Sequence, residues 1–146
     1  TDIEDVSTRG MEDWIDDQLA KPIPFTLKDK VKFYHNFIKT GLNNPAAGQS
    51  YRCWSYAWWQ YHMTSSDFLR QRIALALSEL LVISDKSAFG SNSYALSSYY
   101  DVLLNRAFGN YRDILQDVTY HASMGIYLTY LNNPKSNPAT NTFRHT

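Results

Sequence analysis

The stretch from Arg70 to Ser84 reads RQRIALALSELLVIS, and its pattern decides the fold. Apolar side chains recur at helical spacing and cover much of the circumference. Three residues that favour helix N-termini, Thr64, Ser65 and Ser66, stand before it. We therefore predict a helix over about residues 67–84. Because a helix that is apolar on most sides must be enclosed by others, we predict that this one is the central helix.

The preceding segment, residues 49–63, is rich in aromatic rings and also predicts a helix. Tyr51, Trp54, Trp58 and Tyr61 form a stripe at spacings of three and four residues. Buried between helices, such rings contribute to the core, whereas in water they would suit stacking on a sugar ring. We favour burial. Trp54, Trp58 and Tyr61 are the candidate binding residues of the second interpretation.

Helical patterns continue on both sides of this pair. Gly10 separates two short amphipathic segments, and Thr26 with Asp29 resembles a capping box. The predicted helices span residues 2–6, 11–19, 27–39, 49–63, 67–84, 94–108 and 124–131, with another that is capped by Asn110. The fold class is therefore all-α, an irregular multi-helix bundle of about six to eight helices.

Composition and charge limit the function. Among 146 residues, 14 Lys and Arg balance 14 Asp and Glu, so nucleic acid is not expected as the main partner. The longest apolar run, residues 73–83, falls short of the roughly 20 residues that span a membrane, and no span is expected. Because Cys53 is the sole cysteine and the histidines are dispersed, we predict no disulfide, no metal site and no cofactor.

Three segments that follow Ser84 carry more specific information. They read YYDVLL (99–104), AFGNYRDIL (107–115) and VTYHASMGIYL (118–128), and Asn132 comes after them. In this order and spacing they resemble a large bacterial family catalogued as domain of unknown function 1800. The resemblance implies an exported protein, periplasmic, on the cell surface or extracellular, because many members look exported. It implies no mechanism, because the activity of the family is not established.

The resemblance also concerns the extent of the chain. Family members have a phenylalanine-glycine segment before the position of Thr1 and a further helix after that of Thr146, so the chain resembles about the first half of such a domain. We expect residues 1–133 to be a fragment of a larger helical domain. Residues 134–146 are polar and contain two prolines, so we expect an extended or disordered tail.

His121 is one candidate catalytic residue, since it matches the histidine of the family. It would belong to a polar site with two candidate binding residues, Tyr127 and Asn132. The alternative is a histidine that caps a helix end, where its side chain satisfies unpaired backbone carbonyls. We favour the alternative.

Glu79 is the other candidate catalytic residue. It lies within the apolar run 73–83 and is predicted to be buried, where a raised pKa would suit a general acid paired with Asp101 or Asp117. The alternatives are an ion pair with an arginine or a position on an exposed edge of the helix. We favour an ion pair, because buried charges are costly unless paired.

These patterns leave three functions open. The first is a helical structural and interaction module that packs against the remainder of its own domain or another protein chain, and self-associates without that partner. The second is part of an enzyme acting on an extracellular polymer, where Glu79, His121 and Asn132 converge on a site shared with the missing half. The third is a carbohydrate-binding module with an exposed aromatic stripe.

Overall fold

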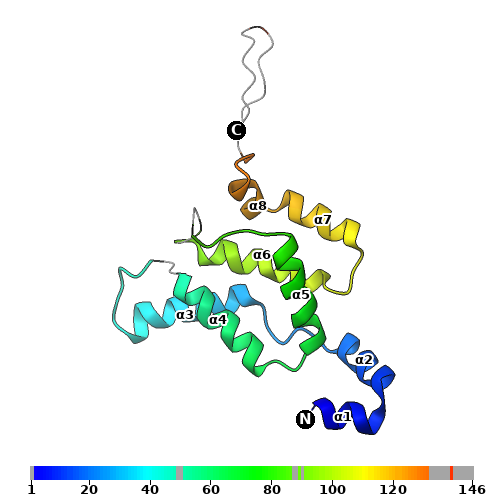
Figure 1. Cartoon of the computed structure of the whole chain (residues 1–146). Helices are drawn as coiled ribbons and strands as arrows, with labels where there is room; N and C mark the ends of the chain where they lie inside the picture. The colour runs from blue at the N-terminus through cyan, green and yellow to red at the C-terminus, as the bar shows by residue number, and fades with distance from the viewer. Residues whose placement is uncertain (1, 49–50, 87–88, 90, 132–138, 140–146) are drawn as a thin grey trace.

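A computed structural model describes residues 2–48, 51–86, 89, 91–131 and 139 of the chain. Within these residues it contains eight α-helices, one π-helical segment and no strand (Figure 1). The elements are α1 (Asp2–Arg9), α2 (Met11–Ala20), α3 (Leu27–Asn36), η1 (Phe37–Gly41), α4 (Tyr51–Thr64), α5 (Phe68–Leu80), α6 (Ser93–Arg106), α7 (Tyr111–Tyr120) and α8 (Ala122–Tyr127). The prediction of an all-α fold is confirmed. The expected tail, residues 134–146, lies outside the described residues except for Ala139.

Local capping signals explain where several helices begin. The Thr26 hydroxyl accepts a hydrogen bond from the backbone N–H of Asp29, as the capping box predicts, and also donates to the Asp29 carboxylate. The Asn110 side chain accepts from the backbone N–H of Arg112 and caps α7. Gly10 separates α1 from α2 with a φ of 92°, a conformation that glycine adopts without steric cost.

The central helix is α6, and the prediction that residues 67–84 supply it is wrong. α6 contacts α3, α4, α5, α7 and α8, and it lies in the middle of the bundle (Figure 1). Its buried residues are Ser93, Leu96, Ser97, Tyr99, Tyr100, Leu103 and Leu104. Two of these residues are serines, and Ser97 satisfies its hydroxyl within the helix by donating to the Tyr94 carbonyl.

α5 is shorter than predicted and ends at Leu80. The next residues leave the helix, and the Leu81 carbonyl accepts a hydrogen bond at 2.6 Å from the Tyr99 hydroxyl of α6. This contact joins residues that are far apart in the sequence, so the apolar pattern of 81–83 could not reveal it. The chain from Leu81 to Asp85 therefore runs as an irregular segment along α6.

The helix that starts at Leu27 changes its hydrogen bonding near its end. After Asn36 the chain forms the π-helical segment η1, in which the Leu42 N–H bonds to the Phe37 carbonyl at 3.1 Å. The Phe37 ring lies where a side chain on Gly41 would stand, since a Cβ at that glycine would be 3.0 Å from the ring. Gly41 thus allows the aromatic ring to fold back over the wider turn.

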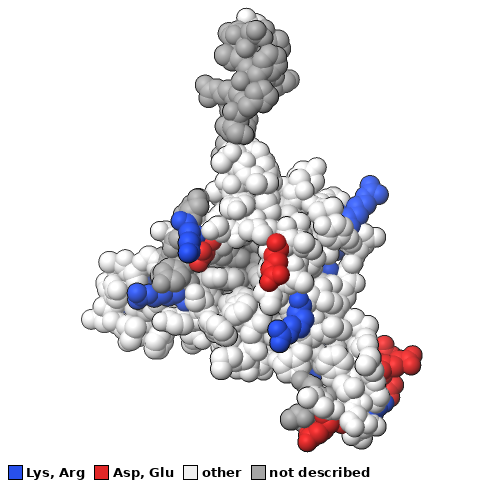
Figure 2. Space-filling model, viewed as in Figure 1, with Lys and Arg blue, Asp and Glu red and all other residues white. Residues whose placement is uncertain are grey.

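Charged side chains are unevenly distributed over the molecule. Acidic side chains gather on α1 and α2, whereas most of the face seen in Figure 2 is uncharged. None of the helices in the described part of the chain is long and apolar enough to cross a membrane.

Candidate functional site

The most deeply buried carboxylate stands at the junction of α4 and α5. Asp67 is 1% exposed, and it accepts hydrogen bonds from the Tyr61 hydroxyl at 2.5 Å and from the Gln71 side-chain amide at 3.0 Å. The Arg70 guanidinium lies 3.7 Å from this carboxylate. Tyr61, Asp67, Arg70 and Gln71 are called the junction cluster below. Burial, reinforced by Asp67, raises the pKa of Tyr61, so its hydroxyl remains a donor.

Arg70 connects this cluster to other elements. It donates to the backbone carbonyls of Lys21 and Leu104, and its guanidinium lies 4.5 Å from the centre of the Phe108 ring. One side chain thus joins the end of α2, the start of α5 and the end of α6. Each partner serves packing, so the cluster has the character of a structural network. Asp67 and Gln71 were not among the candidates from the sequence. Their partners Tyr61, Ser65 and Arg70 are near in sequence, but the burial of Asp67 depends on tertiary packing.

Glu79 is exposed near the end of α5, so the prediction that it is buried is wrong. α5 ends one residue later, which leaves this last turn open to water. No ion pair in the described part of the chain involves Glu79. Glu79 thus lies on an exposed edge of the helix, which was one of the alternatives from the sequence. The ion pair that we favoured is not formed.

The two acids proposed as its partners have structural roles. The Asp101 carboxylate on α6 accepts from the backbone N–H groups of Leu27 at 2.7 Å and Lys28 at 3.0 Å, and so holds the start of α3. Burial raises the pKa of Asp101 to about 6 in spite of these donors. Asp117 forms an ion pair with Arg106 at 2.6 Å.

His121 occupies the turn between α7 and α8, half-buried against the Tyr99 ring. Its Nδ1 accepts the backbone N–H of Ser123 at 3.2 Å, and its Nε2 lies 3.3 Å from the Ser98 hydroxyl. Burial lowers the pKa of His121, which favours the neutral ring whose Nδ1 can accept this hydrogen bond. His121 therefore caps a helix end, as in the alternative that we favoured from the sequence. The partner differs, because His121 accepts a backbone N–H at the N-terminus of α8, whereas we expected it to satisfy backbone carbonyls.

Two further candidates, Tyr127 and Asn132, were expected to share a polar site with His121. Tyr127 is half-buried at the end of α8, and Asn132 lies outside the described residues. No hydrogen bond or ion pair among the described residues joins Glu79 to His121. Over those same residues, no group of three or more metal-ligating side chains is close enough to hold an ion. A polar site around His121 remains a hypothesis.

The aromatic stripe of α4 divides between core and surface. Tyr61 is fully buried, while Trp54 and Trp58 are half-buried and pack against α6, where the Trp54 and Tyr100 rings meet edge to face. The side chain of Tyr51 lies outside the described set. The burial that we favoured is thus confirmed for Tyr61, and a fully exposed sugar platform along the stripe is not formed.

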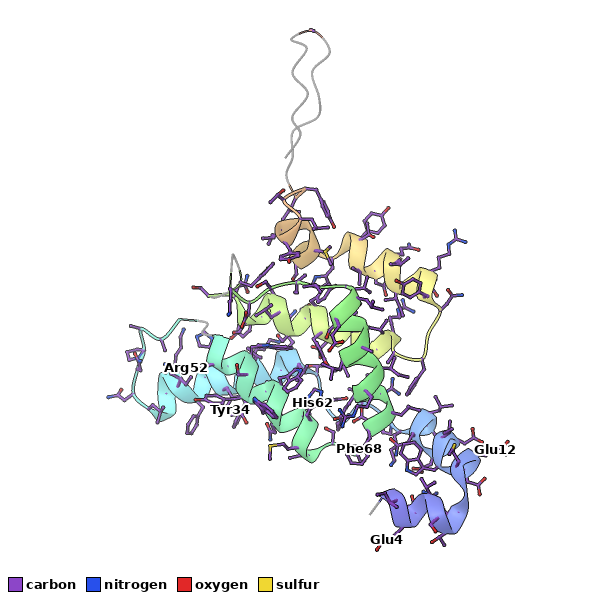
Figure 3. All side chains as sticks on the ribbon, in the orientation of Figure 1. Glu4, Glu12, Tyr34, Arg52, His62 and Phe68 are labelled. Carbon is purple, nitrogen blue, oxygen red and sulfur yellow. The ribbon has the colours of Figure 1, made fainter. Side chains whose placement is uncertain are left out.

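Other rings of α4 lie in the open. Tyr56 is 52% exposed and Trp59 is 59% exposed. With residues of α3 and η1 they line a groove of about 670 Å³. The residues of this α3–α4 groove are Tyr34, Phe37, Ile38, Leu42, Arg52, Tyr56, Trp59 and Gln60. Figure 3 labels Tyr34 and Arg52, which come from its opposite walls.

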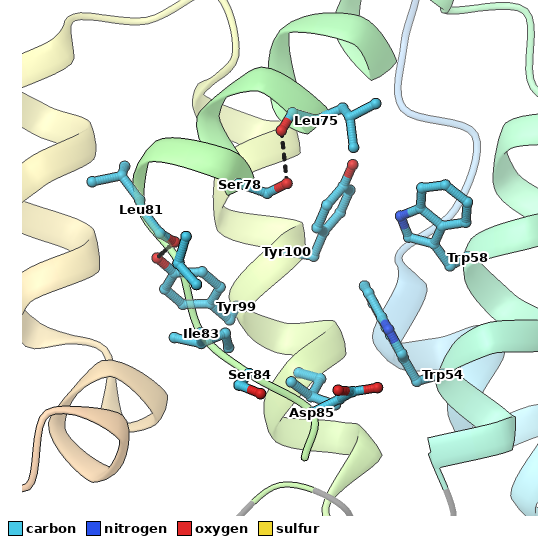
Figure 4. A pocket seen from close by; sticks show the side chains of 12 residues that line it. Trp54, Trp58, Leu75, Ser78, Leu81, Ile83, Ser84, Asp85, Tyr99 and Tyr100 are labelled. Atoms are coloured by element: carbon cyan, nitrogen blue, oxygen red, sulfur yellow. Dashed lines mark hydrogen bonds between the residues drawn. The ribbon is translucent and has the colours of Figure 1, made fainter. Parts of the chain in front are cut away.

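A second hollow lies between α4, α6 and the segment that follows α5. Its volume is about 360 Å³, and Figure 4 shows Trp54 and Trp58 facing Tyr99 and Tyr100 across it, with Asp85 at one end. We call this hollow the α4–α6 cavity. Both tryptophans were binding candidates from the sequence, but the irregular segment from Leu81 to Asp85 that lines the cavity was not predicted.

The fold and these hollows define a class of protein, an all-α bundle with an aromatic groove and a separate aromatic cavity. The family model described as protein of unknown function (DUF1800) matches residues 1–142, and the chain belongs to this family. No curated protein and no solved structure matches the chain. The resemblance seen in the sequence is therefore confirmed, and the function must be argued from the surface.

Proposed function

We propose that the chain is a helical interaction module whose α3–α4 groove binds an apolar segment of polypeptide, supplied by the remainder of its own domain or by another protein. The observation that carries this proposal is the exposure of large rings in one hollow. Phe37 is 51% exposed and Leu42 is 62% exposed, beside Tyr56 and Trp59 from α4. Apolar side chains gathered in this way mark interaction sites in soluble proteins.

The walls of the groove suit an apolar helix or extended peptide. α3 and α4 pack side by side, and the Tyr34 hydroxyl donates to the Gln60 side chain at 2.9 Å across the interface between them. This bond fixes the two walls relative to each other, so a partner would meet a preformed surface. Rings anchor such complexes because they bury a large area at a small cost in side-chain entropy. We also propose that the chain belongs to an exported bacterial protein. This part of the proposal rests on the family resemblance alone.

Dye binding and self-association test the proposal. We expect the wild-type chain to bind an apolar fluorescent dye and to form dimers reversibly in analytical ultracentrifugation. Trp59→Ser and Tyr56→Ser should each weaken both by about tenfold, which corresponds to roughly 1.4 kcal/mol. A monomer that binds no dye would overturn the proposal.

Tyr120→Ser provides the matched control, since Tyr120 is 84% exposed on α7 and does not line the groove. It should change neither readout. Equal effects of Tyr56→Ser and Tyr120→Ser would show that general surface hydrophobicity drives the association, and would also contradict the proposal.

A further inference from the structure

The α4–α6 cavity has a composition unlike that of the groove. Aromatic rings of Trp54, Trp58 and Tyr100 form much of its wall, and leucine and isoleucine side chains complete it. Among the described residues, Asp85 is the one carboxylate that lines it, and no lysine or arginine of that set does. A hollow of about 360 Å³ can hold a small organic molecule.

Hydrogen-bonding groups in the wall are largely engaged with the protein itself. The Ser78 hydroxyl donates to the Leu75 carbonyl at 2.7 Å, and the Tyr99 hydroxyl donates to the Leu81 carbonyl at 2.6 Å, as Figure 4 shows. The Ser84 hydroxyl accepts from the backbone N–H of Lys86. A sugar, which needs many directed hydrogen bonds, would find few partners here.

Two features of the cavity nevertheless indicate a ligand. No ion pair among the described residues involves Asp85, so its carboxylate at the cavity has no cationic partner there. Tyr100 is 5% exposed, and its hydroxyl has no acceptor in the described part of the chain. The ring of His62 stacks on Trp58 at 3.8 Å, and burial lowers the pKa of His62. This histidine therefore adds no positive charge beside the cavity at neutral pH.

We propose that the α4–α6 cavity binds a small organic cation of the alkylammonium class, with the charged group between the tryptophan rings and the Asp85 carboxylate. The faces of aromatic rings carry negative electrostatic potential and attract cations, most strongly for tryptophan. Methyl groups on the nitrogen contact the apolar wall without needing hydrogen-bond acceptors. This site is separate from the α3–α4 groove and does not depend on the function proposed for it.

Titration with choline tests this proposal on the chain as it exists. Trp54 and Trp58 line the cavity, so binding should change tryptophan fluorescence and saturate in the millimolar range, and isothermal titration calorimetry should give the same dissociation constant. The neutral carbon isostere, 3,3-dimethyl-1-butanol, has the same shape without the charge and should bind at least tenfold more weakly. Equal binding of the two probes, or no saturation with choline up to about 0.1 M, would overturn the proposal.

Variants locate the site. Asp85 lies in the segment after α5, and Asp85→Asn keeps the shape of its side chain. The variant should bind choline about tenfold more weakly and should bind 3,3-dimethyl-1-butanol as the wild type does. Asp16→Asn, an exposed acid on α2 away from the cavity, should have no effect on either. Equal affinity of wild type and Asp85→Asn for choline would contradict the assignment. A lysine-containing peptide that binds more tightly than choline would identify the cation as a side chain of a partner.

Discussion

The two sides of α4 carry similar aromatic rings with opposite roles. On one side Tyr61 is fully buried and belongs to the junction cluster, where its hydroxyl reaches Asp67. On the other side Trp59 and Tyr56 stand in the open α3–α4 groove. The helix itself does not distinguish the two sets. Partners that are distant in sequence distinguish them. The spacing of rings therefore predicts which residues share a helix face, but not what packs against that face.

We expect the largest loss of stability from a substitution on the buried side of α4, in the junction cluster. Asp67→Ala would leave the buried Tyr61 hydroxyl without its acceptor. It would also remove one of the two acceptors of the Gln71 amide and the carboxylate beside the Arg70 guanidinium. Removing one member of such a network costs about 3–5 kcal/mol. Urea denaturation of Asp67→Ala and wild type would measure the change in the free energy of unfolding.

Asp16→Ala serves as the control, because Asp16 is exposed and should cost less than about 0.5 kcal/mol. Tyr61→Phe should fall between them, at about 1–2 kcal/mol, since it removes one hydrogen bond and leaves the ring in place. If Asp67→Ala were as stable as Asp16→Ala, the junction cluster would not hold α2, α4, α5 and α6 together.

Part of this architecture could be predicted from sequence. Thr26 and Asn110 act through neighbours two or three residues away, so their caps were predictable, and Gly10 marked a boundary correctly. The end of α5 and the burial of α6 were not. Both depend on Tyr99 reaching across to the Leu81 carbonyl and on serines hidden between helices, contacts that no local pattern encodes.

The candidate site was harder to predict for the same reason. Glu79 looked buried because its neighbours are apolar, yet its position in the last turn of α5 exposes it. Asp101 was named only as a possible partner for Glu79, whereas it holds the N-terminus of α3, which lies more than 70 residues earlier. His121 was expected at a helix end and lies at one, but its partner is the Ser123 N–H and not the carbonyls that we expected.

The α3–α4 groove on the exposed side of α4 can be altered by a substitution at Gly41. In Gly41→Ala the new methyl group would stand 3.0 Å from the Phe37 ring, so the ring must move out of the groove or η1 must rearrange. We expect a loss of about 1–2 kcal/mol of stability and weaker binding of an apolar dye. Gly48→Ala, with nothing within 4 Å of the added atom, should change neither. Unchanged dye binding in Gly41→Ala would show that Phe37 does not shape the groove.

The pH dependence of Asp101 tests how the α3 wall of the groove is held. Its pKa is raised to about 6 from an ordinary value of 3.8, so between these values the folded chain binds more protons than the unfolded chain. The stability contribution of this group is therefore complete below pH 4 and is lost as the pH rises through 6. Asp101→Asn should lack this dependence, so the wild type should lose stability relative to the variant from pH 4 to pH 7.

Thermal unfolding of both proteins at several pH values would measure that difference. A wild type that gains stability relative to Asp101→Asn over this range would mean that the two backbone donors outweigh burial at the carboxylate.

We expect the smallest change in stability from a substitution at His121. This residue lies on neither side of α4, so it serves as a reference for a local polar contact. Its pKa is lowered by burial, so the unfolded chain binds the proton more readily, and stability falls as the pH drops below about 6.5. Asn also caps helix N-termini, so His121→Asn should keep the contact to Ser123 without titrating. The two proteins should differ by less than about 1 kcal/mol at pH 7, with the wild type weakening relative to the variant toward pH 5. A ligand that binds wild type but not His121→Asn at pH 7 would instead indicate a site at this histidine, since the cap is the same in both.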